Sequence, residues 1–215
     1  MGASVMCTPS WTRWRGVKGS RWQPDAGLLD SDGMLIQRRP LITGFGLMLS
    51  ALGCSDELQP VEPGAPAPGF ELEDFQPASP RFGETYGLAE FRGSVLVLPL
   101  YAGWCSTCIG CCSILNDVYK EWQADGLNVQ VAAINPINAR PHQKNLVEVC
   151  DFPLLQDTEE VRAWDTLLGS RDDTYFYNAQ GILTKFIDFK ADLAEMIVSD
   201  AGKALFRRAV VDAGG

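Results

Sequence analysis

The stretch that decides the fold runs from Val95 to Cys112 and reads VLVLPLYAGWCSTCIGCC. Its first part, residues 95–101, is an apolar run that predicts a buried strand. Cys105 and Cys108 follow in a C-x-x-C spacing, where the chain turns from this strand into a predicted helix. A dithiol at that turn indicates redox chemistry, because unpaired N–H groups and the helix dipole favour a thiolate at the first cysteine.

The two cysteines of this motif are expected to have different roles. Cys105, at the start of the helix, is the predicted exposed nucleophile, and Cys108, one turn deeper, is predicted to resolve the mixed disulfide. Trp104 is expected to shield one side of the pair. The alternative is a purely structural Cys105–Cys108 disulfide. The loop that such a disulfide closes is so small that it would constrain the unfolded chain little.

Cys111 and Cys112 lie further along the same predicted helix and are candidate accessory thiols. By its spacing along the helix, Cys112 belongs to the buried face, so we interpret it as a small core residue. The cysteine run could also hold zinc, copper(I) or an iron–sulfur cluster, but four sulfurs on two turns of one helix cannot converge on one ion. A ligand from elsewhere would be required, and Cys150 is either that ligand or another core residue. We therefore predict no metal site.

Three further residues are candidates for a supporting role. His142, the only histidine, is expected to be exposed, with axial haem ligation or proton shuttling as the alternatives. Asp172 and Asp173 precede a predicted strand, where they either form a solvated turn or help proton transfer near the dithiol. No cofactor is predicted besides a redox-active Cys105–Cys108 disulfide.

The order of the predicted elements is that of an α/β fold, with a mixed central sheet and helices on both faces. The alternation of apolar and acidic residues from Phe70 to Phe75 predicts a half-buried edge strand. The strands are expected at 70–75, 95–101, 128–134, 174–177 and 183–189, and the helices at 105–123, 141–149, 158–168 and 191–211.

The charge of the chain excludes one class of partner. The formal net charge of the 215 residues is −9, and from Ser55 onward 12 Lys and Arg stand against 24 Asp and Glu. Such a domain repels the phosphates of nucleic acids, and no basic stripe offsets the repulsion. Nucleic-acid binding is therefore not expected.

The region before the domain has the layout of an export signal. Arg38 and Arg39 precede the uncharged run 41–53, which ends in small residues before Cys54. This pattern resembles the bacterial lipoprotein signal, in which Cys54 would be lipidated; plain secretion and an uncleaved anchor are the alternatives. The expected organisation is a non-native or disordered extension, a signal peptide, a Pro-rich tether and a domain, at 1–33, 34–54, 55–69 and 70–215.

Several of these segments resemble the thioredoxin-like superfamily. Ala65–Leu72 is similar to the entry segment of its extracytoplasmic and peroxiredoxin-related members, and Trp104–Cys108 to its redox motif. Thr174–Leu183 is similar to its late strand, turn glycine and following strand. A closer resemblance is to the N-terminal domain of selenoprotein P, carried by Ala163–Asp173 and the Tyr-rich strand that follows. These resemblances imply a thioredoxin-like fold.

The selenoprotein P resemblance also implies roles for individual residues. Cys105 occupies the position of that family's selenocysteine, and Cys108 that of its partner cysteine. Ordinary thioredoxins place a cis-proline before the strand that faces the dithiol, whereas Asp172 or Asp173 stands here, as in selenoprotein P. This departure argues against broad disulfide-reductase activity and slightly favours metal binding.

The sequence thus predicts an exported, lipid-anchored thiol–disulfide oxidoreductase in the periplasm or cell envelope. Its partners would be protein or small-molecule thiols and disulfides, and its anchor would hold it at a membrane. A thiol peroxidase of the same fold is the second prediction, although the usual Thr and Arg support around the cysteine is missing. A non-enzymatic module that binds metal or haem, and a scaffold with a fossil redox site, are the alternatives from other classes.

Overall fold

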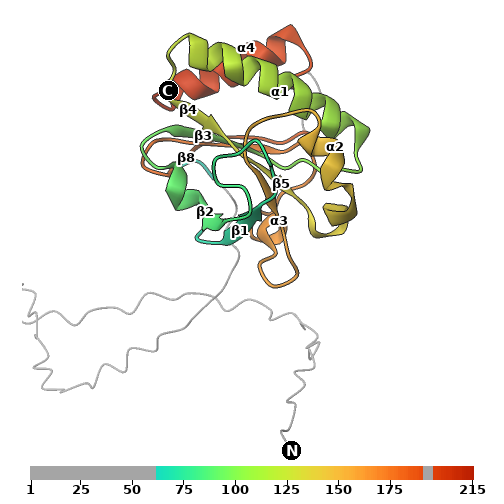
Figure 1. Cartoon of the computed structure of the whole chain (residues 1–215). Helices are drawn as coiled ribbons and strands as arrows, with labels where there is room; N and C mark the ends of the chain where they lie inside the picture. Colours follow the sequence, from blue (N-terminus) through green and yellow to red (C-terminus); the bar gives the residue numbers. More distant parts are fainter. Residues whose placement is uncertain (1–61, 191–195) are drawn as a thin grey trace, which may run out of the picture. The chain divides into compact units, whose positions relative to one another are not determined.

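The computed structural model describes residues 62–190 and 196–215 (Figure 1). The extension 1–33, the signal peptide 34–54, the lipidation site Cys54 and most of the tether lie outside the described residues. Within the part of the chain that is described, no helix is long and apolar enough to span a membrane.

One four-stranded sheet is built around the predicted strand before the cysteines. This strand, β3 (Val95–Pro99), pairs in parallel with β4 (Val129–Val131) and antiparallel with β7 (Thr174–Tyr177). On the far side of β7 lies β8 (Leu183–Ile187), so the order is β4-β3-β7-β8. Every residue of β3 is buried, as expected for a central strand covered on both faces.

A second four-stranded sheet has the order β2-β1-β6-β5. Its strands are β1 (Glu71–Asp74), β2 (Thr85–Gly87), β5 (Ala133–Asn135) and β6 (Leu154–Gln156). The two sheets meet where Leu100 and Ile134 form a parallel bridge. The prediction of one strand at 128–134 was therefore wrong: the chain passes from one sheet to the other at Ala132.

The first predicted strand is not at an edge of the sheet. β1 lies between β2 and β6, and its acidic residue Asp74 is fully buried. The preceding residues are also bonded to the domain, although the tether was predicted to continue to Gly69. The Gly64 N–H donates to Leu183 O at 2.8 Å, and the Leu183 N–H donates to Ala65 O at 2.8 Å.

Helices cover both faces of the β4-β3-β7-β8 sheet. Figure 1 shows α1 (Ser106–Ala124) and α4 (Asp200–Asp212) side by side on one face. Because side chains alternate along β3, Val95 and Val97 pack into the core beneath these two helices. The opposite face carries a second core, which includes Leu96 and Leu98 of β3 together with residues of the short helices η1 (Leu88–Phe91) and α3 (Ala163–Thr166).

The other helices differ from their predicted lengths. The segment predicted as a helix at 141–149 is the end of η2 (Ile137–His142) followed by α2 (Gln143–Val147). α3 is much shorter than the predicted 158–168, because the buried Asp157 carboxylate accepts the backbone N–H groups of Thr158, Ala163 and Trp164 and holds a loop instead.

Candidate redox site

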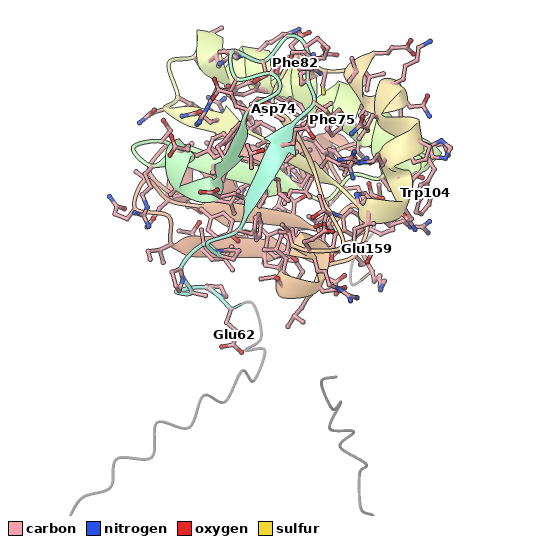
Figure 2. The ribbon with its side chains drawn as sticks, turned by 60° about the horizontal axis from the view of Figure 1, so that its bottom comes forward. Glu62, Asp74, Phe75, Phe82, Trp104 and Glu159 are labelled. Atoms are coloured by element: carbon pink, nitrogen blue, oxygen red, sulfur yellow. The ribbon has the colours of Figure 1, made fainter. Side chains whose placement is uncertain are left out.

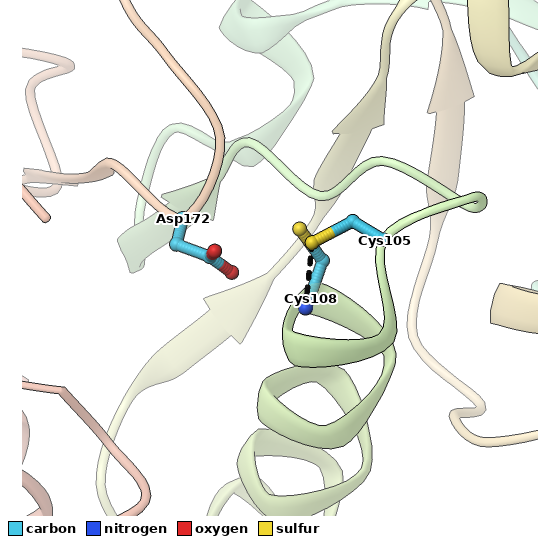
Figure 3. A group of neighbouring side chains, drawn as sticks. All are labelled: Cys105, Cys108 and Asp172. Atoms are coloured by element: carbon cyan, nitrogen blue, oxygen red, sulfur yellow. Dashed lines mark hydrogen bonds between the residues drawn. The ribbon is translucent and has the colours of Figure 1, made fainter.

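The dithiol sits where β3 delivers the chain to α1. Cys105 is the N-cap residue of this helix, with extended backbone (φ −96°, ψ 113°). Its Sγ accepts the backbone N–H of Cys108 at 3.3 Å, which is one of the N–H groups that the start of a helix leaves unpaired (Figure 3). Both residues are free thiols. The structure thus places the first sulfur at the positive end of a 19-residue helix.

A carboxylate from a distant part of the chain completes this site. Asp172 precedes β7 in a left-handed backbone conformation (φ 66°), and its N–H donates to Leu100 O at 2.8 Å. In Figure 3 its side chain points toward the two sulfurs. One ligand atom each of Cys105, Cys108 and Asp172 lies within 4.8 Å of the other two.

All three of these side chains are buried. The exposed fraction is 6% for Cys105, 0% for Cys108 and 8% for Asp172. The prediction of an exposed Cys105 was wrong, because its side chain packs into the core that β3 shares with α1. Among the residues that the structure describes, no donor reaches hydrogen-bonding geometry with either carboxylate oxygen of Asp172.

Burial dominates the electrostatics of this site. It raises the pKa of the Cys108 thiol far above its ordinary value, and the hydrogen bond with Cys105 adds to the rise. Burial also raises the pKa of the Asp172 carboxyl, with the Cys108 thiol and the charge of Arg171 opposing the shift in part. The resolving thiol is therefore held protonated until a base takes its proton.

The neighbouring aspartate has a different environment. Asp173 accepts the backbone N–H and the hydroxyl of Ser170 at 2.6 and 3.1 Å, and the N–H of Phe189 at 3.1 Å. Its carboxylate therefore fastens the loop before β7. Of the two predicted supporting carboxylates, the structure brings only Asp172 to the sulfurs.

The accessory thiols lie deeper in α1. Cys112 is fully buried in the core, and its pKa is raised first by a hydrogen bond with Cys150 and then by burial. Cys111 lines a small cavity of about 10 Å³ together with Asp172 and other residues, and burial raises its pKa to about 12. The interpretation of Cys112 as a core residue agrees with its burial.

Trp104 lies next to the dithiol and is 44% exposed. Its indole N–H donates to the Asn138 side chain at 3.1 Å. The ring lines an open cleft of about 300 Å³ together with Ile137, Trp164 and Glu159. Trp104 and Glu159 lie on the same side of the molecule (Figure 2). The indole thus forms part of the wall of an open cleft, and the two cysteines, which are buried, do not line it.

The sequence analysis missed the residues that hold the loop before Cys105. The Gly103 N–H donates to the Asn135 side chain at 2.9 Å, and Gly103 O accepts from the Asn145 side chain at 2.8 Å. The Asn135 amide in turn donates to Gln156 at 2.8 Å. The available signal was a polar residue at the end of an apolar run. His142 is exposed, as predicted, but its backbone packs so tightly against Gly103 that a Cβ there would lie 2.4 Å from His142 O.

A mixed sheet whose central strand leads into a helix with a C-x-x-C dithiol at its first turn defines a thioredoxin-like protein. The chain belongs to the AhpC/TSA family, which matches residues 63–186. This match covers more than half of the chain and begins just before the residues that pair with β8.

Individual relatives agree with this class. Thiol-disulfide oxidoreductase ResA of Geobacillus thermodenitrificans (strain NG80-2) is 25% identical over 149 residues, 66% of this chain and 81% of that protein. A thiol:disulfide interchange protein of Chlorobium tepidum TLS superposes with a TM-score of 0.52 and 21% identity, covering 73% of this chain and 100% of that one. Peroxidoxin BcpB of Mycobacterium tuberculosis gives a TM-score of 0.52 and 17% identity over 71% and 96%. The two structures share the fold.

Proposed function

We propose that this protein is a thiol–disulfide oxidoreductase that acts outside the cytoplasm. The observation that carries the proposal is the position of the dithiol: Cys105 caps α1 and its Sγ receives the Cys108 N–H at 3.3 Å. The same chemistry is named in the ResA relative. The match to the AhpC/TSA family includes both cysteines of the dithiol.

In the proposed reaction Cys105 is the nucleophile. Its thiolate attacks one sulfur of a substrate disulfide, forms a mixed disulfide and expels the other substrate sulfur as a thiolate. Cys108 then gives up its proton and attacks the Cys105 sulfur, which releases the second substrate thiolate. The products are a reduced substrate and a Cys105–Cys108 disulfide, so two electrons pass from the dithiol to the substrate.

Asp172 is the supporting residue in this proposal. Its carboxylate is within 4.8 Å of both sulfurs, so it is placed to receive the proton that Cys108 loses. Trp104 supports the reaction differently: it precedes Cys105 and lines an open cleft, and we propose that a partner binds in that cleft. Cys111 and Cys112 have no step in the reaction.

The location outside the cytoplasm rests on the signal-like segment 34–54. We propose that Cys54 is lipidated and that the residues after it hold the domain near a membrane, where its partners are protein or small-molecule thiols and disulfides. Mass spectrometry of the mature protein tests the anchor: a lipid-modified N-terminal Cys54 is expected, and an unmodified N-terminus at another residue contradicts it.

Reduction of a protein disulfide tests the function itself. The full chain is expected to catalyse the reduction of insulin by a dithiol reductant, and Cys105→Ser is expected to abolish the catalysis. Cys112→Ala is the matched control, because it removes a thiol of the same helix that has no part in the reaction. Unchanged turnover in Cys105→Ser rejects the proposal.

A thiol peroxidase is the second candidate, favoured by the family and by the shared fold of the peroxidoxin structure. In this reaction a peroxide would oxidise Cys105 to a sulfenic acid. The Cys108 thiol would then condense with the sulfenic acid, which releases water and forms the same Cys105–Cys108 disulfide. Consumption of hydrogen peroxide with a thiol reductant separates the candidates. If the protein turns over peroxide much faster than it reduces insulin, its function is that of a peroxidase.

The resemblance to selenoprotein P stays a prediction about the same site. It implies that Cys105 stands where that family has selenocysteine. Replacing Cys105 with selenocysteine is then expected to give an active and faster enzyme, and an inactive product contradicts the resemblance.

A further inference from the structure

Asp172 is a buried carboxylate beside the dithiol. It is 8% exposed, and neither carboxylate oxygen has a hydrogen-bonding partner among the described residues. Burying a carboxylate without partners costs free energy, and native structures keep such a group where something else pairs with it. Asp173, one residue along, accepts three hydrogen bonds, so the lack of partners is a property of this position.

The arrangement around Asp172 is that of a cation site. Two sulfurs and a carboxylate oxygen lie within 4.8 Å of one another, contributed by the first turn of α1 and by the loop before β7. Figure 3 shows the carboxylate directed at the sulfurs. Helix α1 alone could not provide this set, because four sulfurs on two turns of one helix cannot converge on one ion. The folded chain supplies the further ligand 60 or more residues later, as Asp172.

We propose that the reduced protein binds one Zn²⁺ ion through Cys105, Cys108 and Asp172. Zinc takes thiolates and carboxylates together in tetrahedral sites, whereas copper(I) prefers soft ligands alone and magnesium and calcium prefer oxygen. Three protein ligands and one open position form the pattern of exchangeable zinc sites. This inference goes beyond the proposed function and does not depend on it.

The geometry requires only a small contraction. Two sulfurs at Zn–S distances of about 2.3 Å in a tetrahedral site lie about 3.8 Å apart, so atoms within 4.8 Å of one another need to move by roughly 1 Å. Asp172 also lines a cavity of about 10 Å³, together with Cys111 and Tyr101, which is close to the space of one water molecule.

Zinc binding and disulfide formation exclude each other at this site. Binding of Zn²⁺ to the two thiols releases two protons and transfers no electron, so the ion keeps its oxidation state. Formation of the Cys105–Cys108 disulfide removes two of the three protein ligands. The reduced protein is therefore the zinc-binding form, and oxidation releases the ion.

Competition with a chromogenic chelator tests the site on the full chain. The reduced, metal-stripped protein is expected to take up one equivalent of Zn²⁺, and the oxidised protein none. Asp172→Asn, which keeps the shape of the side chain but not its charge, is expected to weaken binding by roughly tenfold or more. Cys105→Ser and Cys108→Ser are expected to abolish it, while Cys112→Ala, a thiol outside the set, retains it. Co²⁺ in place of zinc gives an independent readout through its thiolate charge-transfer bands.

Three results overturn the proposal. No uptake by the reduced protein rejects a site. Uptake that Asp172→Asn leaves unchanged means that the dithiol binds alone, and equal uptake by the oxidised protein means that the ion binds elsewhere. Insulin reduction measured with a chelator present is separate from all of these, so loss of the zinc site and loss of the proposed function are distinguishable.

Discussion

Asp172 and Asp173 are adjacent in sequence, yet their carboxylates have opposite surroundings. Asp173 accepts two hydrogen bonds from Ser170 in its own loop and one from Phe189 beyond β8. Asp172 faces two sulfurs and has no hydrogen-bond donor among the described residues. Asp172 also adopts a left-handed backbone, which is uncommon outside glycine and clusters at functional sites. The fold thus keeps an energetically costly carboxylate at a position from which it reaches the dithiol.

Replacing Asp172 by Asn is expected to stabilise the metal-free, reduced protein at pH 7. Burial raises the pKa of this carboxyl, so folding favours its protonated form. The contribution of such a group is present at low pH and is lost as the pH rises through the folded-state pKa. The gain in Asp172→Asn is therefore expected at neutral pH and shrinks below about pH 4, where the carboxyl is protonated in the unfolded chain as well.

Thermal unfolding between pH 3 and 8, with a chelator present, measures this difference. Asp173→Asn is the matched control: burial raises the pKa of this carboxyl as well, but the substitution weakens three hydrogen bonds and is therefore expected to lower the melting temperature at pH 7. If Asp172→Asn is as destabilising as Asp173→Asn at neutral pH, the carboxylate has a partner after all.

The resolving role of Cys108 gives a second test on one residue. Cys108→Ser is expected to react once with a substrate disulfide and to stay as a mixed disulfide through Cys105, because the thiol that displaces the substrate is gone. Mass spectrometry of the intact protein detects the adduct. Release of substrate at the wild-type rate would assign the resolving step to Cys111 or another thiol.

Between the elements, the loop that joins β3 to α1 decides where the sulfurs lie. It is fastened by the Asn135 and Asn145 side chains and by the close approach of Gly103 to the His142 backbone. None of these residues carries the redox chemistry. They fix the N-cap geometry of Cys105, on which the reactivity depends.

Gly103→Ala is expected to lower the rate of disulfide exchange by roughly tenfold to a hundredfold. The added Cβ would lie 2.4 Å from His142 O, so the loop must shift and carry Cys105 with it. Gly110→Ala, in the middle of α1, is the matched control, since a Cβ there meets nothing within 4 Å. It is expected to keep the activity and to stabilise the protein by about 0.5–1 kcal/mol. Equal rates in the two variants would show that the loop does not position the dithiol.

Helices and strands were predictable from the sequence where a single pattern of apolar residues continues along the whole element. The apolar run before the cysteines gave β3, and the spacing of Cys108, Cys112 and Leu115 gave the buried face of α1. The breaks were not predictable, because they depend on distant partners. The strand predicted at 128–134 breaks at Ala132 because two sheets meet there. Hydrogen bonds to the Asp157 carboxylate hold a loop where the first turns of the helix at 158–168 were predicted.

In the redox site, too, some residues were predictable from the sequence and others were not. Cys105 and Cys108 were identified by spacing alone, since residues three apart at a helix start are necessarily close. That Asp172 and not Asp173 faces them depends on the backbone conformation before β7, and the local sequence does not encode which carboxylate finds partners. The buried amides Asn135 and Gln156 were missed because a polar residue has no periodic signal.

For the molecule as a whole, one buried carboxylate joins the parts of the second sheet. Asp74 in β1, labelled in Figure 2, is 0% exposed. Its oxygens accept the Ser79 hydroxyl at 2.5 Å, the Tyr86 hydroxyl of β2 at 2.8 Å and the Leu154 N–H of β6 at 3.2 Å. The Gln76 N–H adds a further bond at 3.0 Å. Three strands and a turn thus converge on a group that is not part of the dithiol site.

Asp74→Ala is expected to destabilise the protein by on the order of 3 kcal/mol, because it leaves several buried donors without an acceptor. Tyr86→Phe removes only one donor and is expected to cost about 1.5 kcal/mol. Denaturant unfolding of the reduced full chain measures both, and insulin reduction far below the melting temperature is expected to stay at the wild-type rate. In the Asp74→Ala background, Tyr86→Phe is expected to cost little more, since its acceptor is already gone. Full additivity of the two losses would mean that the hydroxyl stabilises the fold through packing and not through Asp74, and a parallel loss of exchange activity would mean that the second sheet positions the dithiol as well.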